Sequence, residues 1–349
     1  MGEWKWTPGA WYGDATDSGI QTSQDAKFYG LSAKLSEPFT NKGKDLVLQF
    51  SVKHEQELDC GGAYLKLLGD MDQDKFGGDT PYQVMFGPDV CGSSNRKTHA
   101  IFHYAPKADN LLIKEELRTE TDKASHLYTL HVKADNSFEV FIDEESVRTG
   151  NLEDAWDFLV AKQIKDPQQK KPADWVDEKK IPDPEDKKPA GYDDIPESIP
   201  DPDASKPEDW DNEEDGEWEP PLIDNPEYKG AWKPKMIENP AYKGEWVHPM
   251  IPNPDYAEDK DLHFRCNECT HIGFELWQVK SGSLFDDIIV TDSLEEAKAY
   301  AAKTYQKKKG PEKVALEAHE AAEREANKPS EEESKKDKDE EEEESHDEL

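Results

Sequence analysis

Two histidines and two cysteines lie close together in the pattern His263-x-x-Cys266-x-x-Cys269-x-His271. These side chains are common zinc ligands, and C-x-x-C is also the spacing of a redox-active pair or of a local disulfide. One short segment rarely wraps a tetrahedral ion, so zinc is the less favoured interpretation. A disulfide, free thiols and zinc all remain open at Cys266 and Cys269.

The C-terminal segment offers a different chemistry, because 12 of the residues in 331–349 are Asp or Glu. A flexible polyanion cannot build the closed shell of about six to eight oxygens that holds calcium tightly. It is expected to bind many Ca²⁺ ions weakly, with dissociation constants around 10⁻⁴–10⁻³ M. The low complexity and the charge of residues 327–349 predict a disordered acidic tail.

The last four residues, His346, Asp347, Glu348 and Leu349, match the HDEL signal for retention in the endoplasmic reticulum. The signal predicts a location in the lumen and a retention-signal receptor as a partner. No signal peptide is visible at the Met1 end, and because retention presupposes entry, the Met1-Gly2 start is expected not to be that of the original chain. No run of 18 apolar residues is present, and no transmembrane segment is expected.

No pattern in the chain indicates an enzyme. There is no Ser-His-Asp arrangement, no glycine-rich phosphate loop and no zinc-protease helix motif. Paired carboxylates carry no information in a chain with 79 Asp and Glu residues. No catalytic residue is therefore predicted.

The composition limits the architecture that must position these groups. The 349 residues carry a net charge of −36 and are only 34% hydrophobic, which is too polar for one compact globule. Strong acidity argues against nucleic acid and favours cations or basic partners. Of the 24 prolines, 17 lie between Ile164 and Tyr256. Ordinary helix or sheet is excluded there, because proline lacks a backbone donor.

Two internal repeats fill this proline-rich middle. The unit I-x-D-P-x-x-x-K-P-x-x-(W/Y) occurs three times, and three copies of G-x-W-x-x-x-x-I-x-N-P-x-Y follow with a period of 14. This order predicts a hairpin arm over 164–257 whose outbound units face inbound ones, with the turn near 211–216. Tryptophans of the two legs are expected to stack, namely Trp175 and Trp210 against Trp218, Trp232 and Trp246.

Short alternating segments on both sides of the arm predict β-strands. They are 46–52, 63–67, 128–132 and 138–142, followed by 274–279 and 287–290 after the arm. The arm is therefore expected to be inserted into one mainly β sandwich formed by 1–163 and 258–326. Ser293 and Glu296 have capping-box spacing and predict a helix to about Ala326, with a break at Gly310-Pro311.

The repeat units and their order resemble the proline-rich arm of the calreticulin family, the soluble lectin chaperones of the endoplasmic reticulum. Two positions depart from the pattern: Tyr192 replaces a repeat tryptophan, and Pro249 sits one residue later than its counterparts. The resemblance implies a legume-lectin-like jelly-roll sandwich with an extended β-hairpin arm, a C-terminal helix and an acidic tail. The absence of a predicted span separates the chain from the membrane-anchored calnexins.

Segments 60–66, 82–91 and 276–282 look like the sugar-binding strands of this family. The resemblance implies glycan contacts from Tyr64, Lys66, Tyr82, Met85, Asp89, Ile101, Glu275 and Trp277. These side chains suit a neutral sugar, because carboxylates and Lys bond to hydroxyls while flat rings cover the C–H face of the sugar. Glu275 stands where the family has Asp, which lengthens its reach by one methylene. Taken singly, Tyr64, Met85 and Trp277 would also suit a core.

The resemblance implies three further features. A disulfide joins Cys60 to Cys91, and one structural Ca²⁺ is bound by Asp286 together with carbonyls of a loop at 14–18, which is one residue shorter here. The arm tip, with Glu213, Asp215, Glu217 and Trp218, docks a thiol oxidoreductase of the disulfide-isomerase family. By the same resemblance, about 30 N-terminal residues of the family's first domain, and one calcium ligand with them, are expected to be absent from this sequence.

Three functions compete. The leading hypothesis is a monomeric, calcium-binding lectin chaperone that binds monoglucosylated N-glycans on unfolded glycoproteins. The alternative is a low-affinity, high-capacity calcium storage protein with vestigial glycan binding. The third is a glycoside hydrolase, which needs two carboxylates about 5–9.5 Å apart, and only Asp89 and Glu275 are candidates.

Overall fold

A computed structural model describes residues 1–207, 210 and 216–327. The chain divides into two compact units. Unit 1 comprises Met1–Val160 and Asp255–Leu349, and unit 2 is the intervening segment Ala161–Pro254. Each unit is described by itself.

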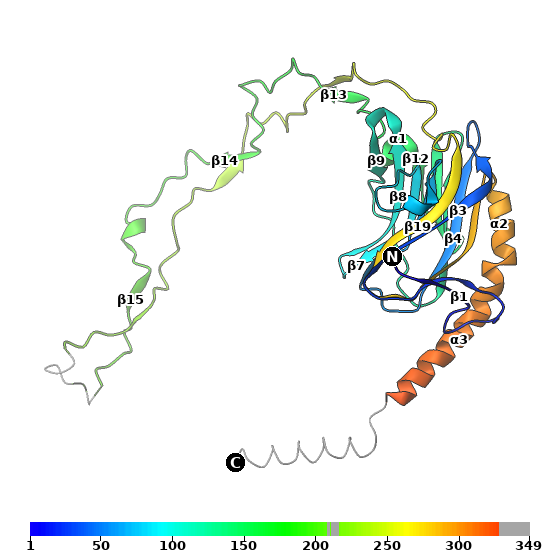
Figure 1. The fold of residues 1–349 in the computed structure, drawn as a ribbon. Coiled ribbons are helices and arrows are strands. Elements are labelled where there is room, and N and C mark those ends of the chain that lie inside the picture. The colour runs from blue at the N-terminus through cyan, green and yellow to red at the C-terminus, as the bar shows by residue number, and fades with distance from the viewer. Residues whose placement is uncertain (208–209, 211–215, 328–349) are drawn as a thin grey trace, which may run out of the picture. The chain divides into compact units, whose positions relative to one another are not determined.

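Unit 1 is a sandwich of two mainly antiparallel seven-stranded sheets (Figure 1). Sheet A has the order β1-β2-β20-β4-β10-β11-β12, and sheet B has the order β3-β19-β5-β7-β8-β9, with β6 between β19 and β7. The strands of sheet A are β1 Trp4–Thr7, β2 Gly19–Thr22, β4 Leu46–His54, β10 Ser125–Val132, β11 Ser137–Ile142, β12 Glu145–Asn151 and β20 Ser283–Thr291. Those of sheet B are β3 Lys27–Phe39, β5 Cys60–Gly62, β6 Leu65–Leu68, β7 Val84–Cys91, β8 Asn95–Tyr104, β9 Asp109–Leu112 and β19 Cys269–Gln278. The short helices of unit 1 are η1 Gln73–Lys75, η2 Ala105–Lys107 and α1 Leu152–Ala155.

Strand β4 shows why the core lies between the two sheets. All nine of its residues are buried, but its two faces differ in chemistry. Leu48, Phe50 and Val52 belong to the apolar core. On the other face, the Gln49 amide donates to the Ala297 carbonyl of the C-terminal helix at 3.2 Å. One face of sheet A is therefore covered by sheet B, and the other by helices.

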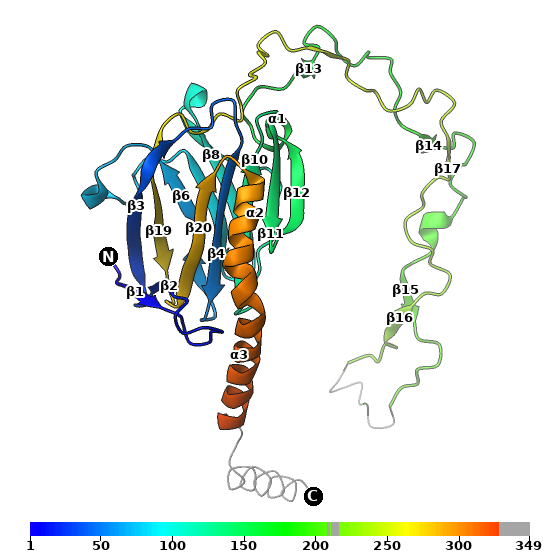
Figure 2. The same ribbon diagram turned by 90° about the vertical axis from the view of Figure 1, so that its right-hand side faces the viewer.

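These helices are α2 Leu294–Lys303, which lies against sheet A, and α3 Tyr305–Ala326, which begins there and continues beyond the ends of the strands (Figure 2). Ser293 caps α2 as expected, because its hydroxyl accepts from the Glu296 amide at 3.2 Å. The predicted break at Gly310-Pro311 is wrong: Pro311 lies inside α3, and the break falls at Thr304. Tyr305 explains the difference. It is fully buried and donates to Asp143 at 2.6 Å, so tertiary anchoring decides where the helix bends.

Two disulfides stabilise unit 1. Cys60 and Cys91 are bonded to each other and are also register partners of β5 and β7. Cys266 and Cys269 form the second disulfide, and both are fully buried. With their sulfur atoms joined, these cysteines are not thiolate ligands, so the structure favours the disulfide over free thiols or zinc.

Unit 2 consists of short two-stranded ladders. β13 Gln163–Lys165 pairs with β18 Met250–Pro252, β14 Lys180–Pro182 with β17 Met236–Glu238, and β15 Ser198–Pro200 with β16 Leu222–Asp224. The first outbound repeat thus meets the last inbound one, as the repeat order predicts. Helix η3, Tyr192–Asp194, interrupts the outbound leg. None of the described residues of unit 2 is buried.

The repeat residues supply hydrogen bonds in place of a core. Asn239 shows the pattern: its backbone amide donates to the Lys179 carbonyl and its side-chain amide to the Glu178 carbonyl, both at 2.9 Å. Asn225 and Asn253 make the same pair of bonds at their own ladders. One asparagine every 14 residues therefore ties the two legs together.

The aromatic residues act differently from the prediction. Among the described residues, no ring contact joins tryptophans of opposite legs. Instead, the Trp175 indole donates to the Gly244 carbonyl at 2.9 Å and the Trp210 indole to Gly216 at 3.0 Å. The Lys243 ammonium lies 5.9 Å from the Trp175 ring centroid. A two-stranded ladder has only one layer, so an indole finds a backbone carbonyl and a lysine rather than a partner ring.

Candidate functional site

The register of sheet B brings most of the predicted glycan residues onto one face. Lys66 of β6 pairs with Met85 of β7, and Met85 pairs with Ile101 of β8. Alternate residues of β7, Val84 and Phe86, lie in the core. Because side chains alternate along a strand, Lys66, Met85 and Ile101 face away from that core. Met85 is nevertheless buried, with only 8% of its surface exposed, although it does not belong to the core cluster between the sheets.

A buried ion pair lies at the centre of this face. The Lys66 ammonium is 2.9 Å from Glu275 Oε2, and both side chains are largely buried. The same ammonium lies 5.1 Å from the ring centroid of Tyr82. The Lys66–Glu275 contact joins β6 to β19 across 209 positions of the sequence. Glu275 reaches a cation here, and the longer side chain is accommodated.

Tyr64, His99 and Asp89 form a second group beside the ion pair. The rings of Tyr64 and His99 are parallel within 9°, with centroids 6.5 Å apart. Burial, followed by the charges of Glu275 and Asp89, raises the pKa of Tyr64 above its ordinary value. The phenol therefore keeps its proton at neutral pH and can donate a hydrogen bond. Gly87 permits this packing, because its φ is +136° and a Cβ there would lie 2.8 Å from the Tyr64 backbone.

Asp89 keeps hydrogen-bonding capacity for a ligand. It accepts one bond from the Asn95 amide at 3.3 Å, while His99 Nε2 lies 3.6 Å away. Burial lowers the pKa of His99, so this contact is not an ion pair at neutral pH. Both ring nitrogens of His99 are buried without a hydrogen-bond partner. A buried polar group without a partner is costly, and an incoming hydroxyl would satisfy it.

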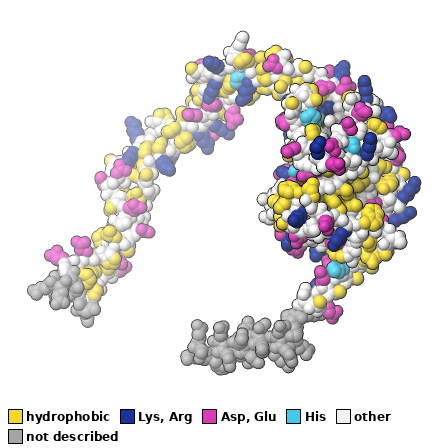
Figure 3. All heavy atoms as spheres, viewed as in Figure 1, with side chains coloured by type: hydrophobic (Ala, Val, Ile, Leu, Met, Phe, Trp, Pro, Cys, Tyr) yellow, Lys and Arg dark blue, Asp and Glu magenta, His cyan; other side chains and the backbone are white. Residues whose placement is uncertain are grey.

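Trp277 extends the face to the sheet edge. It lies two residues after Glu275 and is the register partner of Phe28 in β3. The two rings are 4.6 Å apart, and Phe28 and Trp277 are 56% and 37% exposed. The space-filling view shows hydrophobic side chains gathered on unit 1 with charged ones around them (Figure 3). Exposed paired rings suit the apolar face of a sugar better than they suit a core.

Sequence reasoning missed His99 and Phe28. Phe28 faces the site only because β3 pairs with β19, which lies about 250 residues further along the chain. His99 alternates with the core residues Ala100 and Phe102, and this alternation was the available signal. A strand prediction over 95–104 would have placed His99 and Ile101 on the same face.

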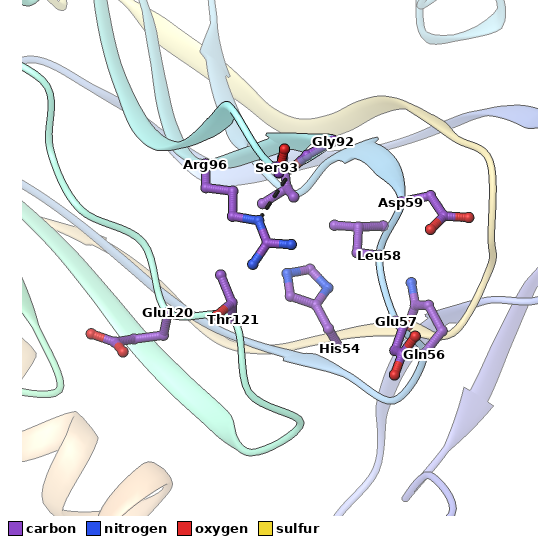
Figure 4. Close-up of a pocket in the computed structure, with 11 residues that line it drawn as sticks. His54, Gln56, Glu57, Leu58, Asp59, Gly92, Ser93, Arg96, Glu120 and Thr121 are labelled. Atoms are coloured by element: carbon purple, nitrogen blue, oxygen red, sulfur yellow. Dashed lines mark hydrogen bonds between the residues drawn. The ribbon is translucent and has the colours of Figure 1, made fainter. Parts of the chain in front are cut away.

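A separate cavity of about 520 Å³ lies beyond the Cys60–Cys91 end of the sheet (Figure 4). Its walls include His54 at the end of β4 and Arg96 of β8. Burial, with a smaller effect of His126, lowers the pKa of His54 to about 4, so the imidazole is neutral. None of the eight predicted glycan residues lines this cavity, which is therefore distinct from the face described above.

Asp286, the predicted calcium ligand, lies at a bulge of β20 beside α3. Its carboxylate and that of Asp287 each lie 2.7 Å from the Lys308 ammonium. Ser51 donates to Asp287 at 2.7 Å. Asp14 and Asp17, from the loop expected to complete the calcium shell, line a cavity of about 20 Å³ with Asp286 and Lys308. Both carboxylates are thus paired with an internal ammonium, and among the described residues no group of three or more His, Cys, Asp or Glu side chains is arranged to hold a metal ion.

The model of the calreticulin family matches residues 1–216 and 212–290, well over half of the chain.

The chain belongs to the calreticulin family.

Calreticulin of Euglena gracilis is 59% identical over 324 residues, which cover 93% of this chain and 80% of the relative. Calreticulin of Dictyostelium discoideum is 56% identical over 321 residues, covering 91% and 74%. Among solved structures, the T. cruzi calreticulin globular domain superposes with a TM-score of 0.66 at 33% identity, covering 92% of this chain and 91% of that one. The predicted family and the lectin-like sandwich are therefore confirmed.

Membership in the calreticulin family carries its general properties. The family consists of calcium-binding lectin chaperones of the endoplasmic reticulum lumen that are not enzymes, as predicted from the sequence. Within the described residues, no helix has the length and apolar character needed to cross a membrane. Glu213, Asp215 and the terminal residues 346–349 lie outside the described residues. At the arm tip, Glu217 is exposed and Trp218 is half-buried.

Proposed function

We propose that this chain binds monoglucosylated N-glycans of unfolded glycoproteins on the outward face of sheet B. The observation that carries the proposal is the largely buried Lys66–Glu275 ion pair at 2.9 Å, flanked by Tyr82. Charged groups held this firmly beside aromatic side chains offer directional bonds to hydroxyls. The proposed contacts are Tyr64, Lys66, Tyr82, Met85, Asp89, Ile101, Glu275 and Trp277.

Different residues of this face are proposed to make different contacts with a sugar. Lys66 donates and Glu275 accepts, while Asp89 accepts from hydroxyls on the far side of Tyr64. Met85 supplies a pliable apolar floor, and Trp277 with Phe28 covers a C–H face of the saccharide. Because these groups, except Tyr64 and Tyr82, sit on strands rather than loops, they are held in position before the ligand arrives.

The remaining roles complete a chaperone cycle. Asp286 contributes to a structural Ca²⁺ site, and the acidic residues of 331–349 bind further Ca²⁺ weakly. The HDEL residues His346–Leu349 engage a retention receptor that keeps the monomeric chain in the lumen. The arm of 164–257 recruits a disulfide-isomerase-type thiol oxidoreductase through Glu213, Asp215, Glu217 and Trp218. An acidic tip with an aromatic residue suits a basic partner surface.

Isothermal titration with a monoglucosylated oligomannose, in 1 mM CaCl₂ and again in EGTA, tests the glycan proposal. Binding is expected to require the terminal glucose and to weaken about 10–100-fold in Asp89→Ala, because a charged hydrogen bond is lost. Asp109→Ala removes an exposed carboxylate of the same sheet and serves as the matched control. A flat titration from a chain that still melts cooperatively would refute glycan binding.

Calcium storage is the second candidate, supported by the 12 acidic residues of 331–349. It predicts that Tyr64→Ala and Asp89→Ala leave cellular function intact while deletion of 331–344 abolishes it. The glycan proposal predicts the opposite order. Measuring glycoprotein secretion and stored calcium in cells carrying each variant separates the two.

A further inference from the structure

The cavity at the Cys60–Cys91 end of the sandwich lies where the apolar core stops. Along β4, Val52 belongs to the core, and His54 is the next residue on the same face. In sheet B, Val90 lies on the face of β7 that carries the core residue Phe86, and Arg96 of β8 is its register partner. The cavity of about 520 Å³ therefore lies between the ends of the two sheets, on the side of β7 opposite the glycan face.

His54 gives this cavity a buried donor. The Ser283 hydroxyl accepts from the Gln56 and Gln278 amides at 2.9 and 2.7 Å, so its own proton is left for His54 Nδ1, at 2.9 Å. Because the imidazole is neutral, its proton then lies on Nε2. The side chain is only 7% exposed, its ring points into the cavity (Figure 4), and Nε2 has no hydrogen-bond partner in the described part of the chain.

The rest of the lining offers both donors and acceptors. Arg96 uses its Nε to donate to the Gly92 carbonyl at 3.2 Å, and its terminal nitrogens make no other hydrogen bond to described residues. Gln56 Oε1 is a buried acceptor that also lacks a partner there, and the exposed Glu57 carboxylate lies on the same wall. A buried polar group without a partner calls for one, so a ligand that donates and accepts would suit this lining.

The charges of the lining nearly cancel. Two of its three carboxylates are paired with basic residues at 3.3 Å, Asp59 with Lys280 and Glu120 with Arg118. The remaining carboxylate, that of Glu57, is balanced in number by the Arg96 guanidinium. A neutral ligand is therefore favoured over an anion or a cation. A hydroxyl both donates and accepts, so a neutral polyhydroxylated molecule matches these walls.

We propose that this cavity is a second saccharide site, which binds one neutral sugar unit without requiring a terminal glucose. His54 and Arg96 donate to its hydroxyl oxygens, and its hydroxyl protons go to Gln56 Oε1 and the Glu57 carboxylate. The volume falls within the range of about 300–1,000 Å³ typical of small-molecule sites. The inference does not rest on the glycan face, because the two sites have no lining residue in common.

The test uses the full chain and an oligomannose that retains its two N-acetylglucosamine residues but carries no glucose. Its dissociation constant is measured by titration with saturation-transfer NMR. Arg96→Ala is expected to weaken binding about 10–100-fold, because charged hydrogen bonds are lost. His54→Phe keeps an aromatic ring but removes the Nε2 donor, and it should weaken binding in the same direction. Arg324→Ala removes an exposed arginine of α3 and serves as the matched control.

Asp89→Ala separates the two sites. It is expected to leave binding of the glucose-free probe unchanged while it weakens binding of the glucose-bearing oligomannose. If the glucose-free probe also depends on Asp89, the probe occupies the glycan face and the second site is refuted. If the parent does not bind this probe at all, the second site is refuted and the glycan face is untouched.

Two further outcomes bear on the cavity itself. Unchanged binding in both Arg96→Ala and His54→Phe would place the sugar elsewhere and overturn the proposal. If His54→Phe does not fold, Arg96→Ala decides alone, because Arg96 is exposed and lies outside the core. If reduced, carboxymethylated α-lactalbumin without glycans displaces the probe, and does so only when Arg96 is present, the cavity is a peptide site and the proposal fails.

Discussion

The sandwich and the arm are both ordered, but different interactions stabilise them. The sandwich buries a continuous apolar core between two sheets, with contacts that join residues far apart in sequence. The arm has no buried residue among those described and relies on hydrogen bonds repeated every 14 residues. A core couples distant positions, so the sandwich should unfold as one cooperative unit. Repeated local bonds should instead open one ladder at a time.

The largest expected loss of unfolding free energy comes from truncating a core residue of the sandwich, which tests whether the sandwich unfolds as one unit. Phe50 packs between the sheets against Phe86, Tyr128 and Phe274. Phe50→Ala is expected to cost about 3–5 kcal/mol, because it removes apolar contacts and leaves a cavity. Urea unfolding followed by tryptophan fluorescence measures it, with Ile237→Ala in the arm as the counterpart expected to leave the main transition unchanged. A loss below 1 kcal/mol for Phe50→Ala would contradict a single shared core.

The two disulfides offer a comparison within the sandwich. Cys60–Cys91 closes a loop with a sequence separation of 31, and Cys266–Cys269 one of 3. In the chain-entropy model their contributions are about 3–4 and about 2 kcal/mol, respectively. Unfolding of the double Ser variants of each pair should show this order, and an inverted order would mean that native-state packing outweighs loop closure. Glycan titration of the Cys60/Cys91 variant would further show whether the crosslink holds the binding strands in place.

The sandwich contains a buried polar network that has no buried counterpart in the described part of the arm. This network predicts that the unfolding free energy of the sandwich depends on pH. Burial lowers the pKa of His126, but hydrogen bonds and charges from Asp122 and Asp143 outweigh it and raise the pKa to about 9. Since this exceeds the unfolded value near 6.5, the stabilisation is complete below about pH 6.5 and is lost as the pH rises toward 9. The difference in unfolding free energy between the parent and His126→Gln should shrink by about 1–3 kcal/mol over that window. Urea unfolding at pH 6, 7.5 and 9 measures it; a constant difference would refute the charged pair.

The smallest expected loss of stability is for a substitution in the arm. Asn239→Ala removes the side-chain bond to the Glu178 carbonyl and the turn that Asn239 makes with Ala241. The cost is about 1 kcal/mol and should remain local. Hydrogen exchange should rise in 180–182 and 236–238 while the ladders at Asn225 and Asn253 keep their rates. A change at all three ladders would show that the arm is cooperative after all.

The fold was predictable where the sequence is periodic. The alternation in 46–52, 128–132 and 138–142 marks strands that the structure contains as β4, β10 and β11. Edge strand β3 was not predicted, because buried and exposed residues do not alternate clearly along its 13 residues. Family resemblance supplied the eight glycan residues, which stay a prediction, whereas the places of Phe28 and His99 depended on which strands become neighbours. The break in the C-terminal helix was misplaced because Tyr305 is anchored by Asp143, a contact across 162 positions.

The sequence by itself determined the arm and its pairing, the chemistry of the acidic C-terminus and the membership in the calreticulin family. Each of these depends on local spacing, which a linear pattern records directly. Only the tertiary structure decided that Lys66 meets Glu275, that the aromatic residues of the arm bond to carbonyls, and that Lys308 holds Asp286 and Asp287. The physical reason is that these contacts depend on sheet register and helix docking, which arise from burying the whole core at once.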